Sequence, residues 1–158
     1  MLLSLRGVLP FVAVNRNLAQ TIAAGAAAIH ARGVEAEAVR AVGRDNPALQ
    51  TNRGLAFHAT DNDTLIAYSK STADGDNAVL AVVNLDPHHV QTGWVTLDLD
   101  VLGLDDDAPF QMHELLTGAR YLWHGRRNFV RLDPSASPAH VFRVRRRVRT
   151  ERDFDYFL

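Results

Sequence analysis

Short apolar runs separated by turn signals fill the sequence after Pro47, and they limit the folds that it can adopt. The runs contain Ile, Val, Leu, Phe and Tyr, and turn-forming residues recur between them. Strands of this length with such spacing are typical of antiparallel sandwiches and barrels. We therefore predict a mainly β fold, an antiparallel β-sandwich, with strands at Leu55–His58, Thr64–Lys70, Ala78–Leu85, Val95–Leu99, Phe110–Leu115, Asn128–Leu132 and His140–Arg145.

The turn at residues 71–77 gives the clearest local signal. It contains Asp74-Gly75, a pair that favours the positive φ angles of a hairpin turn. We therefore expect the second and third strands to form a β-hairpin. The three consecutive aspartates at residues 105–107 are expected in a loop.

The segment before residue 45 has a different composition, rich in Ala and without Trp or Tyr. Larger apolar residues recur at helical spacing between Leu18 and Val42, which predicts one or two helices with a break near Gly33. Gly43 is a plausible helix end, with Pro47 shortly after it. We divide the chain into an Ala-rich, partly helical leader at residues 1–43 and an all-β domain at residues 44–158.

Length and charge exclude several classes of protein. The chain has 158 residues, fewer than the roughly 200–250 of a (β/α)8 barrel. Its net charge of −1 argues against a dedicated nucleic-acid or membrane-surface binder. With no Cys, it can have no disulfide and no zinc-thiolate site, which is compatible with a cytoplasmic location. No apolar run is long enough to span a bilayer, and Arg6 and Asn15 interrupt the N-terminal run that a signal peptide would need.

No residue pattern indicates catalysis, a cofactor or a metal. Adjacent His88 and His89 would point to opposite faces of a strand and cannot share one ion. Carboxylate pairs could support glycoside chemistry, but Asp is also favoured in turns, where its side chain caps the backbone. We assign no catalytic, cofactor-binding or metal-binding residue, and we expect turn roles for Asp61, Asp63, Asp74, Asp76, Asp105, Asp106 and Asp107.

Aromatic side chains could stack on sugar rings or fill the core. Trp94 and Trp123 are the candidate sugar platforms, with Tyr68 and Tyr121 nearby in the pattern. Aromatic residues in a small β domain more often lie in its core, so both interpretations stay open.

The C-terminal region combines a basic run with an apolar end. Residues 143–149 contain five arginines, which could bind nucleic acid or could keep a solvated strand edge from pairing. Acidic residues follow at once. The chain then ends in an apolar group that either forms an interdomain or subunit contact or docks back onto this domain's own sheet: Phe154, Tyr156, Phe157 and Leu158.

Several motifs, in order from about residue 44 to 158, resemble the C-terminal region of bacterial α-1,4-glucan:maltose-1-phosphate maltosyltransferases, the GlgE-type enzymes of glycoside hydrolase family 13. The most specific is the run Asn84-Leu85-Asp86-Pro87-His88-His89. The others are Asp45–Gln50, Thr60–Asp63, Ala67–Lys70, Glu114–Tyr121 with Trp123, Pro138–Val144 and Asp153–Phe157.

The resemblance implies an all-β domain that packs on a catalytic barrel. The family transfers maltosyl units from maltose 1-phosphate to α-1,4-glucan, with an Asp nucleophile and a Glu acid/base on that barrel. The barrel motifs are missing here, so no catalytic residue can be carried over. We expect an accessory domain, inactive alone, from a truncated or frame-shifted frame or a dissected fragment. Its expected partners are the parent barrel or a second subunit; the alternative is a free-standing α-glucan-binding module.

Overall fold

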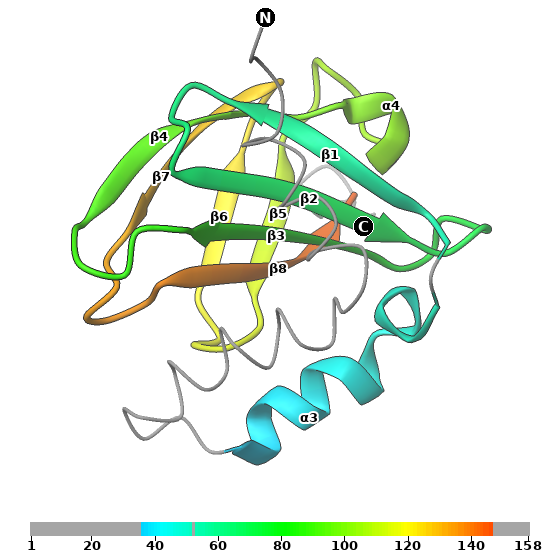
Figure 1. Cartoon of the computed structure of the whole chain (residues 1–158). Coiled ribbons are helices and arrows are strands. Elements are labelled where there is room, and N and C mark those ends of the chain that lie inside the picture. Colours follow the sequence, from blue (N-terminus) through cyan, green and yellow to red (C-terminus); the bar gives the residue numbers. More distant parts are fainter. Residues whose placement is uncertain (1–35, 52, 147–158) are drawn as a thin grey trace, which may run out of the picture.

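The computed structural model describes residues 36–51 and 53–146, and antiparallel strands make up most of this part. Eight strands form one sheet in the order β6-β5-β8-β3-β2-β1-β4-β7 (Figure 1). The predicted mainly β, antiparallel fold is confirmed. The strands are β1 Leu55–Thr60, β2 Leu65–Ser71, β3 Ala78–Asn84, β4 Gln91–Thr96, β5 Phe110–Glu114, β6 Arg120–Trp123, β7 Arg127–Leu132 and β8 Ala139–Arg145.

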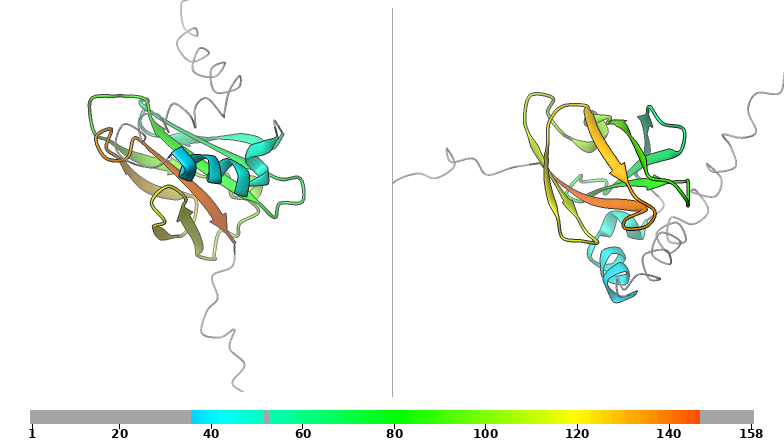
Figure 2. Two further views of the ribbon diagram at one scale, coloured as in Figure 1. Left: turned by 90° about the horizontal axis from the view of Figure 1, so that it is seen from below. Right: turned by 90° about the vertical axis from the view of Figure 1, so that its left-hand side faces the viewer.

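The sheet curls into two layers that enclose one apolar core (Figure 2). Leu80 and Phe142, at the centre of the sheet, face inward with Val95 and Leu132 from its β4–β7 end. Each of these side chains is at most 2% exposed, and burying one stabilises the fold by about 1.5–3 kcal/mol. Strands β6 and β7 follow each other in the chain yet occupy the two ends of the sheet.

The β2–β3 hairpin confirms the turn predicted from Asp74-Gly75. Gly75 has a φ of 74°, and the Thr72 N–H donates to the Asn77 carbonyl oxygen at 2.9 Å. Strands β2 and β3 pair over their whole length, from Ser71 opposite Ala78 to Leu65 opposite Asn84.

The prediction of a strand at Val95–Leu99 is wrong in its bounds. Strand β4 ends at Thr96, and the chain then enters the short helix α4, Leu99–Leu102. The Asp98 carboxylate caps this helix by accepting from the Val101 N–H at 3.3 Å. The alternation of apolar residues predicted a strand, but the cap directs the chain into a helical turn that closes the core.

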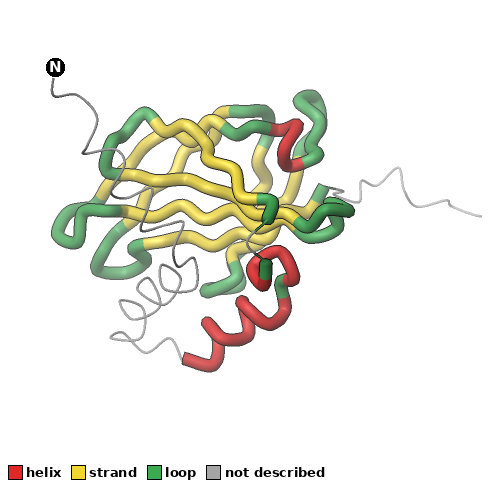
Figure 3. The backbone as a smooth tube through the Cα atoms, turned by 45° about the vertical axis from the view of Figure 1, so that its right-hand side comes forward, coloured by secondary structure: helices red, strands yellow, loops and turns green. Residues whose placement is uncertain are grey.

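Helix α3, Ala36–Asp45, packs on the outside of the sheet and continues two residues past the predicted end at Gly43 (Figures 1 and 3). Its Val42 is buried with Val79 of β3 and Val141 of β8. The 3-10 helix η1, Pro47–Gln50, follows it.

Two asparagines fix helix α3 to the sheet. Asn46 donates from Nδ2 to the Val42 carbonyl oxygen at 2.8 Å, and its Oδ1 accepts from Asn77 Nδ2 at 3.1 Å. Asn77 Oδ1 accepts in turn from the Ala48 N–H at 3.1 Å. The start of the helix predicted from Leu18 and its break near Gly33 lie in residues 1–35, outside the described residues. The domain boundary after residue 43 stays a prediction.

Gly93 of β4 offers a test of the packing between β4 and the β1–β2 turn. A Cβ at Gly93 would lie 2.9 Å from Leu65 Cδ1 and 3.0 Å from Asp61 Oδ1. We expect Gly93→Ala to lower the free energy of unfolding by about 1–3 kcal/mol, because close-packed neighbours must shift. Gly43→Ala is the matched control; no atom lies within 4 Å of its added Cβ, and a helical Ala should raise stability by up to about 1 kcal/mol. Urea unfolding measures both, and equal effects would contradict the packing argument.

Candidate functional site

An exposed aromatic pair lies on the outer side of β4 and β7, at one end of the sheet. Trp94 and Phe129 are direct cross-strand partners and are 42% and 52% exposed. Their ring centroids are 5.5 Å apart in an edge-to-face arrangement. We call the outward side of these two strands the β4–β7 face; its exposed side chains are Thr92, Trp94, Thr96, Arg127, Phe129 and Arg131.

Two charged groups hold Trp94 in place. The guanidinium of Arg127 lies 5.1 Å from the indole centroid, within cation–π range. Asp61 Oδ1 accepts from the backbone N–H of Trp94 at 2.7 Å, and its Oδ2 lies 3.6 Å from Arg127 Nη2. Arg127 and the Phe129 ring contact the indole, and Trp94 remains 42% exposed, so part of its ring is open for stacking on a sugar.

Trp123, the other predicted sugar platform, belongs to the core. It is 8% exposed, and its ring centroid lies 5.2 Å from that of Phe142. A ring buried in this way presents no free face to a ligand. Of the two interpretations left open for these residues, core packing therefore describes Trp123, and Trp94 remains as the sugar-stacking candidate.

The sequence did not point to Phe129 or Arg127. Both lie on β7, where Arg127, Phe129 and Arg131 alternate with the buried Asn128, Val130 and Leu132. That alternation was the available signal, but it does not say which strand lies beside Trp94.

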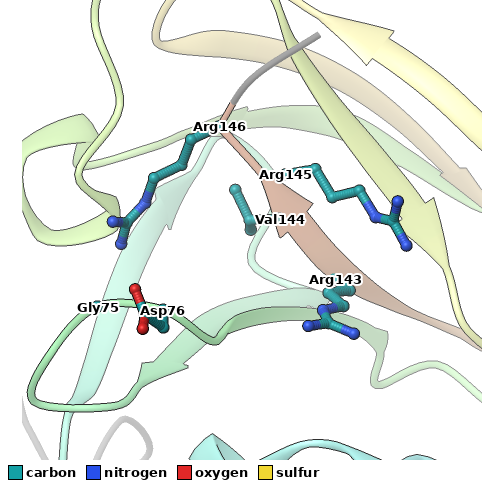
Figure 4. Close-up of a pocket in the computed structure, with 6 residues that line it drawn as sticks. All are labelled: Gly75, Asp76, Arg143, Val144, Arg145 and Arg146. Carbon is teal, nitrogen blue, oxygen red and sulfur yellow. The ribbon is translucent and has the colours of Figure 1, made fainter. Parts of the chain in front are cut away.

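The basic residues of β8 do not form a strand edge. Strand β8 lies between β5 and β3, so the predicted role of these arginines in blocking edge pairing is wrong for Arg143 and Arg145. A pocket of about 420 Å³ opens beside this strand, lined by Gly75, Asp76, Arg143, Val144, Arg145 and Arg146. Figure 4 shows Arg145 and Arg146 projecting to opposite sides of β8.

Arg146 is held at one side of this pocket. Its Nε donates to the Leu102 carbonyl oxygen at 3.1 Å, and a Cβ added at Gly75 would lie 2.8 Å from its Nη2. The arginines predicted at 147 and 149, and the contact predicted for Phe154, Tyr156, Phe157 and Leu158, lie outside the described residues.

No metal or membrane site emerges from the described part of the chain. Nowhere in residues 36–51 and 53–146 do three His, Asp or Glu side chains gather in a way that could hold an ion. Over the same residues, no helix has the length and apolar character needed to cross a bilayer.

Comparison with known proteins identifies the family. A family model described as "GLGE, C-terminal" matches residues 57–144, more than half of the chain. The chain belongs to the GlgE C-terminal domain family. The resemblance noted in the sequence is thereby confirmed.

Relatives of this GlgE C-terminal domain are much longer than the matched region. The chain is 53% identical over 103 residues to alpha-1,4-glucan:maltose-1-phosphate maltosyltransferase 2 of Streptomyces coelicolor, covering 65% of this chain and 15% of that protein. It is 52% identical over 99 residues to the maltosyltransferase of Corynebacterium glutamicum, covering 63% and 14%. The chain thus corresponds to about 15% of the length of these curated relatives.

Solved structures give a weaker likeness. The GH27 β-L-arabinopyranosidase of Geobacillus stearothermophilus matches with a TM-score of 0.43 and 16% identity, over 63% of this chain and 22% of that one.

The most specific motif of the GlgE C-terminal domain, residues 84–89, builds a loop between β3 and β4 that is held by internal hydrogen bonds. Buried Asn84 donates from Nδ2 to the His89 carbonyl oxygen at 3.0 Å, and its Oδ1 accepts from the Asp86 N–H at 2.8 Å. The Asp86 carboxylate accepts from the N–H groups of His88 and His89 and from Gln91. These hydrogen bonds, the largest from His88, lower the pKa of Asp86 to about 2. The motif is therefore structural within the described residues.

Glu114 organises the turn of the Glu114–Tyr121 motif. This carboxylate is fully buried; Oε2 accepts from the N–H groups of Leu116 and Thr117 at 3.1 and 2.6 Å and from the Thr117 hydroxyl. Its Oε1 accepts from the Val141 N–H on β8 at 3.1 Å. A buried carboxylate satisfied in this way ties the β5–β6 turn to the neighbouring strand.

The buried imidazole of His58 makes the stability of the GlgE C-terminal domain depend on pH. It is buried; Nδ1 accepts from the Asp98 N–H at 3.1 Å and Nε2 lies 2.8 Å from Ser69 Oγ. Burial lowers the pKa of His58 below 6.5, although Asp98 acts in the opposite direction. Folding therefore disfavours the protonated form, and stability is kept above pH 6.5 and lost as the pH falls below it.

For this one group, the free energy of unfolding should change by at most about 1.4 kcal/mol per pH unit. Thermal unfolding between pH 8 and pH 5 measures it, with His58→Gln as the comparison. The variant should show a shallower loss of stability on acidification. His140 and His113 keep a residual pH dependence, because burial lowers their pKa too. Identical slopes for both proteins would contradict the assignment.

Proposed function

We propose that this chain serves as the C-terminal accessory β domain of a maltosyltransferase of the glycoside hydrolase family 13 type, which extends α-1,4-glucan from maltose 1-phosphate. One observation carries the proposal: a match at 53% identity to about 15% of such an enzyme, in the region described as its C-terminal part. In this role the domain covers a flank of the catalytic barrel, and a cytoplasmic location goes with it.

The 158-residue chain should be inactive by itself. Retaining glycosyl transfer uses two carboxyl groups about 5–5.5 Å apart that face the sugar. Three of the described carboxylates have other roles: Glu114 and Asp86 bind backbone N–H groups, and Asp61 binds the backbone N–H of Trp94. These contacts support a structural role for the acidic residues.

Phosphate release from maltose 1-phosphate in the presence of a maltooligosaccharide acceptor tests the inactivity. We expect no release from the purified chain under conditions in which the Streptomyces coelicolor relative is active. Clear turnover that stops when the acceptor is left out would refute the inactivity.

A chimaera tests the accessory role itself. Residues 44–158 replace the corresponding C-terminal region of the Streptomyces coelicolor relative, and the same relative truncated before that region is the control. The chimaera should recover solubility and phosphate release that the truncated enzyme loses. If the chimaera is as poor as the truncated enzyme, the domain does not perform the accessory role.

A second function, α-glucan binding, is favoured by Trp94. Because Trp123 is buried, a sugar that stacks on the exposed indole should change the fluorescence of Trp94 alone. We expect titration with maltoheptaose to give a saturable change at millimolar concentration, absent in Trp94→Phe and retained in Phe110→Leu, a core control on the far side. No response in the unmodified chain removes this function.

A further inference from the structure

A row of basic side chains crosses the outer side of β6, β5 and β8. Arg120 lies directly opposite His113, and His113 directly opposite Arg143. The next row on the same side holds Leu122, Gln111 and Arg145. We call this surface, defined by Arg120, His113, Arg143 and Arg145, the basic face.

The arginines of the basic face make no ion pair within the described part of the chain, although Asp76 lines the same pocket as Arg143 and Arg145. Ion pairs among the described residues involve other arginines, and none includes Arg120, Arg143 or Arg145. Burial lowers the pKa of His113, and the charges of Arg120 and Arg145 lower it further. Glu114 acts in the opposite direction. The positive charges of this surface are therefore those of its arginines, and an acidic segment beside Arg120 would neutralise the one at the edge of the sheet.

The same surface borders an unpaired strand edge. Among the described residues, β6 pairs with β5 alone and ends the sheet. Leu122, on the basic face, is 66% exposed. Tyr121, on the other side of the strand, is 42% exposed, with its ring centroid 5.8 Å from that of Phe142. A segment that added to this edge could therefore gain backbone hydrogen bonds, ion pairs on one side and aromatic contact on the other.

The chain's own C-terminal segment has the matching pattern. In an extended strand, alternate residues point to opposite sides. Residues 151–158 would then place Glu151, Asp153, Asp155 and Phe157 on one side, with Arg152, Phe154, Tyr156 and Leu158 on the other. We propose that residues 151–158 add to the free edge of β6 as a strand, with their three carboxylates and Phe157 on the side of the basic face and the rings of Phe154 and Tyr156 on the side of Tyr121.

The position of β8 makes this pairing reachable. Arg145, at the end of β8, is in register with Gln111, which is in register with Leu122. A strand added beyond β6 would therefore lie three strand spacings, about 14 Å, from the end of β8. The five residues 146–150 can span up to about 17 Å. An attached segment also acts at a millimolar effective concentration, which favours it over a separate partner.

Engineered cysteines test the pairing in the full chain, which has no Cys of its own. The variants Leu122→Cys/Asp153→Cys and Leu122→Cys/Glu151→Cys place thiols on the basic side of the proposed strand pair. The matched control is Thr92→Cys/Asp153→Cys, whose Thr92 is exposed on the β4–β7 face. After mild oxidation of dilute protein, non-reducing gels and mass spectrometry measure the intramolecular disulfide.

We expect at least one Leu122→Cys pair to cross-link within the monomer at least tenfold faster than the control. Rates equal to the control overturn the proposal. Cross-links that form only between copies, and that increase with protein concentration, also overturn it in favour of a second chain at this edge.

Charge reversal tests the role of the basic face. Arg120→Glu with Arg143→Glu should slow cross-linking of the Leu122→Cys/Asp153→Cys protein at least fivefold, and added Glu151→Arg with Asp155→Arg should restore it. Circular dichroism confirms that each variant is folded. A rate unchanged by reversal, in a folded protein, overturns the ionic part of the pairing.

Discussion

Replacing Glu114 by alanine is expected to lower the free energy of unfolding by about 3–4 kcal/mol. The substitution removes the acceptor of three backbone N–H groups, one of them on the buried strand β8. A buried donor left unsatisfied costs about 1–3 kcal/mol, and the two donors in the turn can recover part of their loss from water. Because the carboxylate joins the β5–β6 turn to Val141, the loss should affect the whole sheet.

Urea unfolding followed by circular dichroism measures this effect, and two variants frame it. Glu114→Gln keeps one oxygen acceptor and the side-chain volume, so it should lose less than the alanine variant. Asp105→Ala changes an exposed carboxylate and should alter stability by less than about 0.5 kcal/mol. A loss from Glu114→Ala no larger than that of Asp105→Ala would show that the carboxylate does not hold the turn.

Phe142→Ala is expected to cost about 3–5 kcal/mol, as large aromatic truncations in a core do. Phe142 is 2% exposed, and its ring centroid lies 5.2 Å from that of Trp123 and 5.8 Å from that of Tyr121. The cavity left behind would loosen the inner side of β6 and β8 together.

Phe129→Ala is the matched control for this truncation. Phe129 is 52% exposed and touches Trp94 only through an edge-to-face contact, so its removal should cost less than about 1 kcal/mol. The Trp123 fluorescence reports the loosening directly. Equal losses from the two variants would contradict the placement of the core.

The sequence predicted the strands best where their apolar runs are long. Strands β2 and β3 are seven residues each and nearly coincide with the predicted runs, because both are central and buried on two sides. The four-residue β6 escaped prediction, since Leu122 is exposed while Trp123 is buried and the pattern is too short to define a face. At Leu97 and Leu99, local capping by Asp98 overrode the alternation.

The candidate site was only partly predictable for a related reason. Each tryptophan has one apolar neighbour in the sequence, Val95 or Leu122, so the local pattern does not decide which side of the strand faces the core. Asp61 and Arg127 meet Trp94 through pairings between segments more than thirty residues apart. A single sequence carries no record of such pairings, whereas the turn roles of Asp61 and Asp74 follow from local chemistry alone.

The short connection between β6 and β7 has a geometric consequence. From Trp123 to Arg127 the chain takes four steps, which span at most about 14 Å. A flat sheet of eight strands would place its first and last strands about 34 Å apart. This link is therefore too short for the sheet to be open and flat. Lengthening it with flexible residues should reduce the curvature of the sheet before any strand pairing is lost.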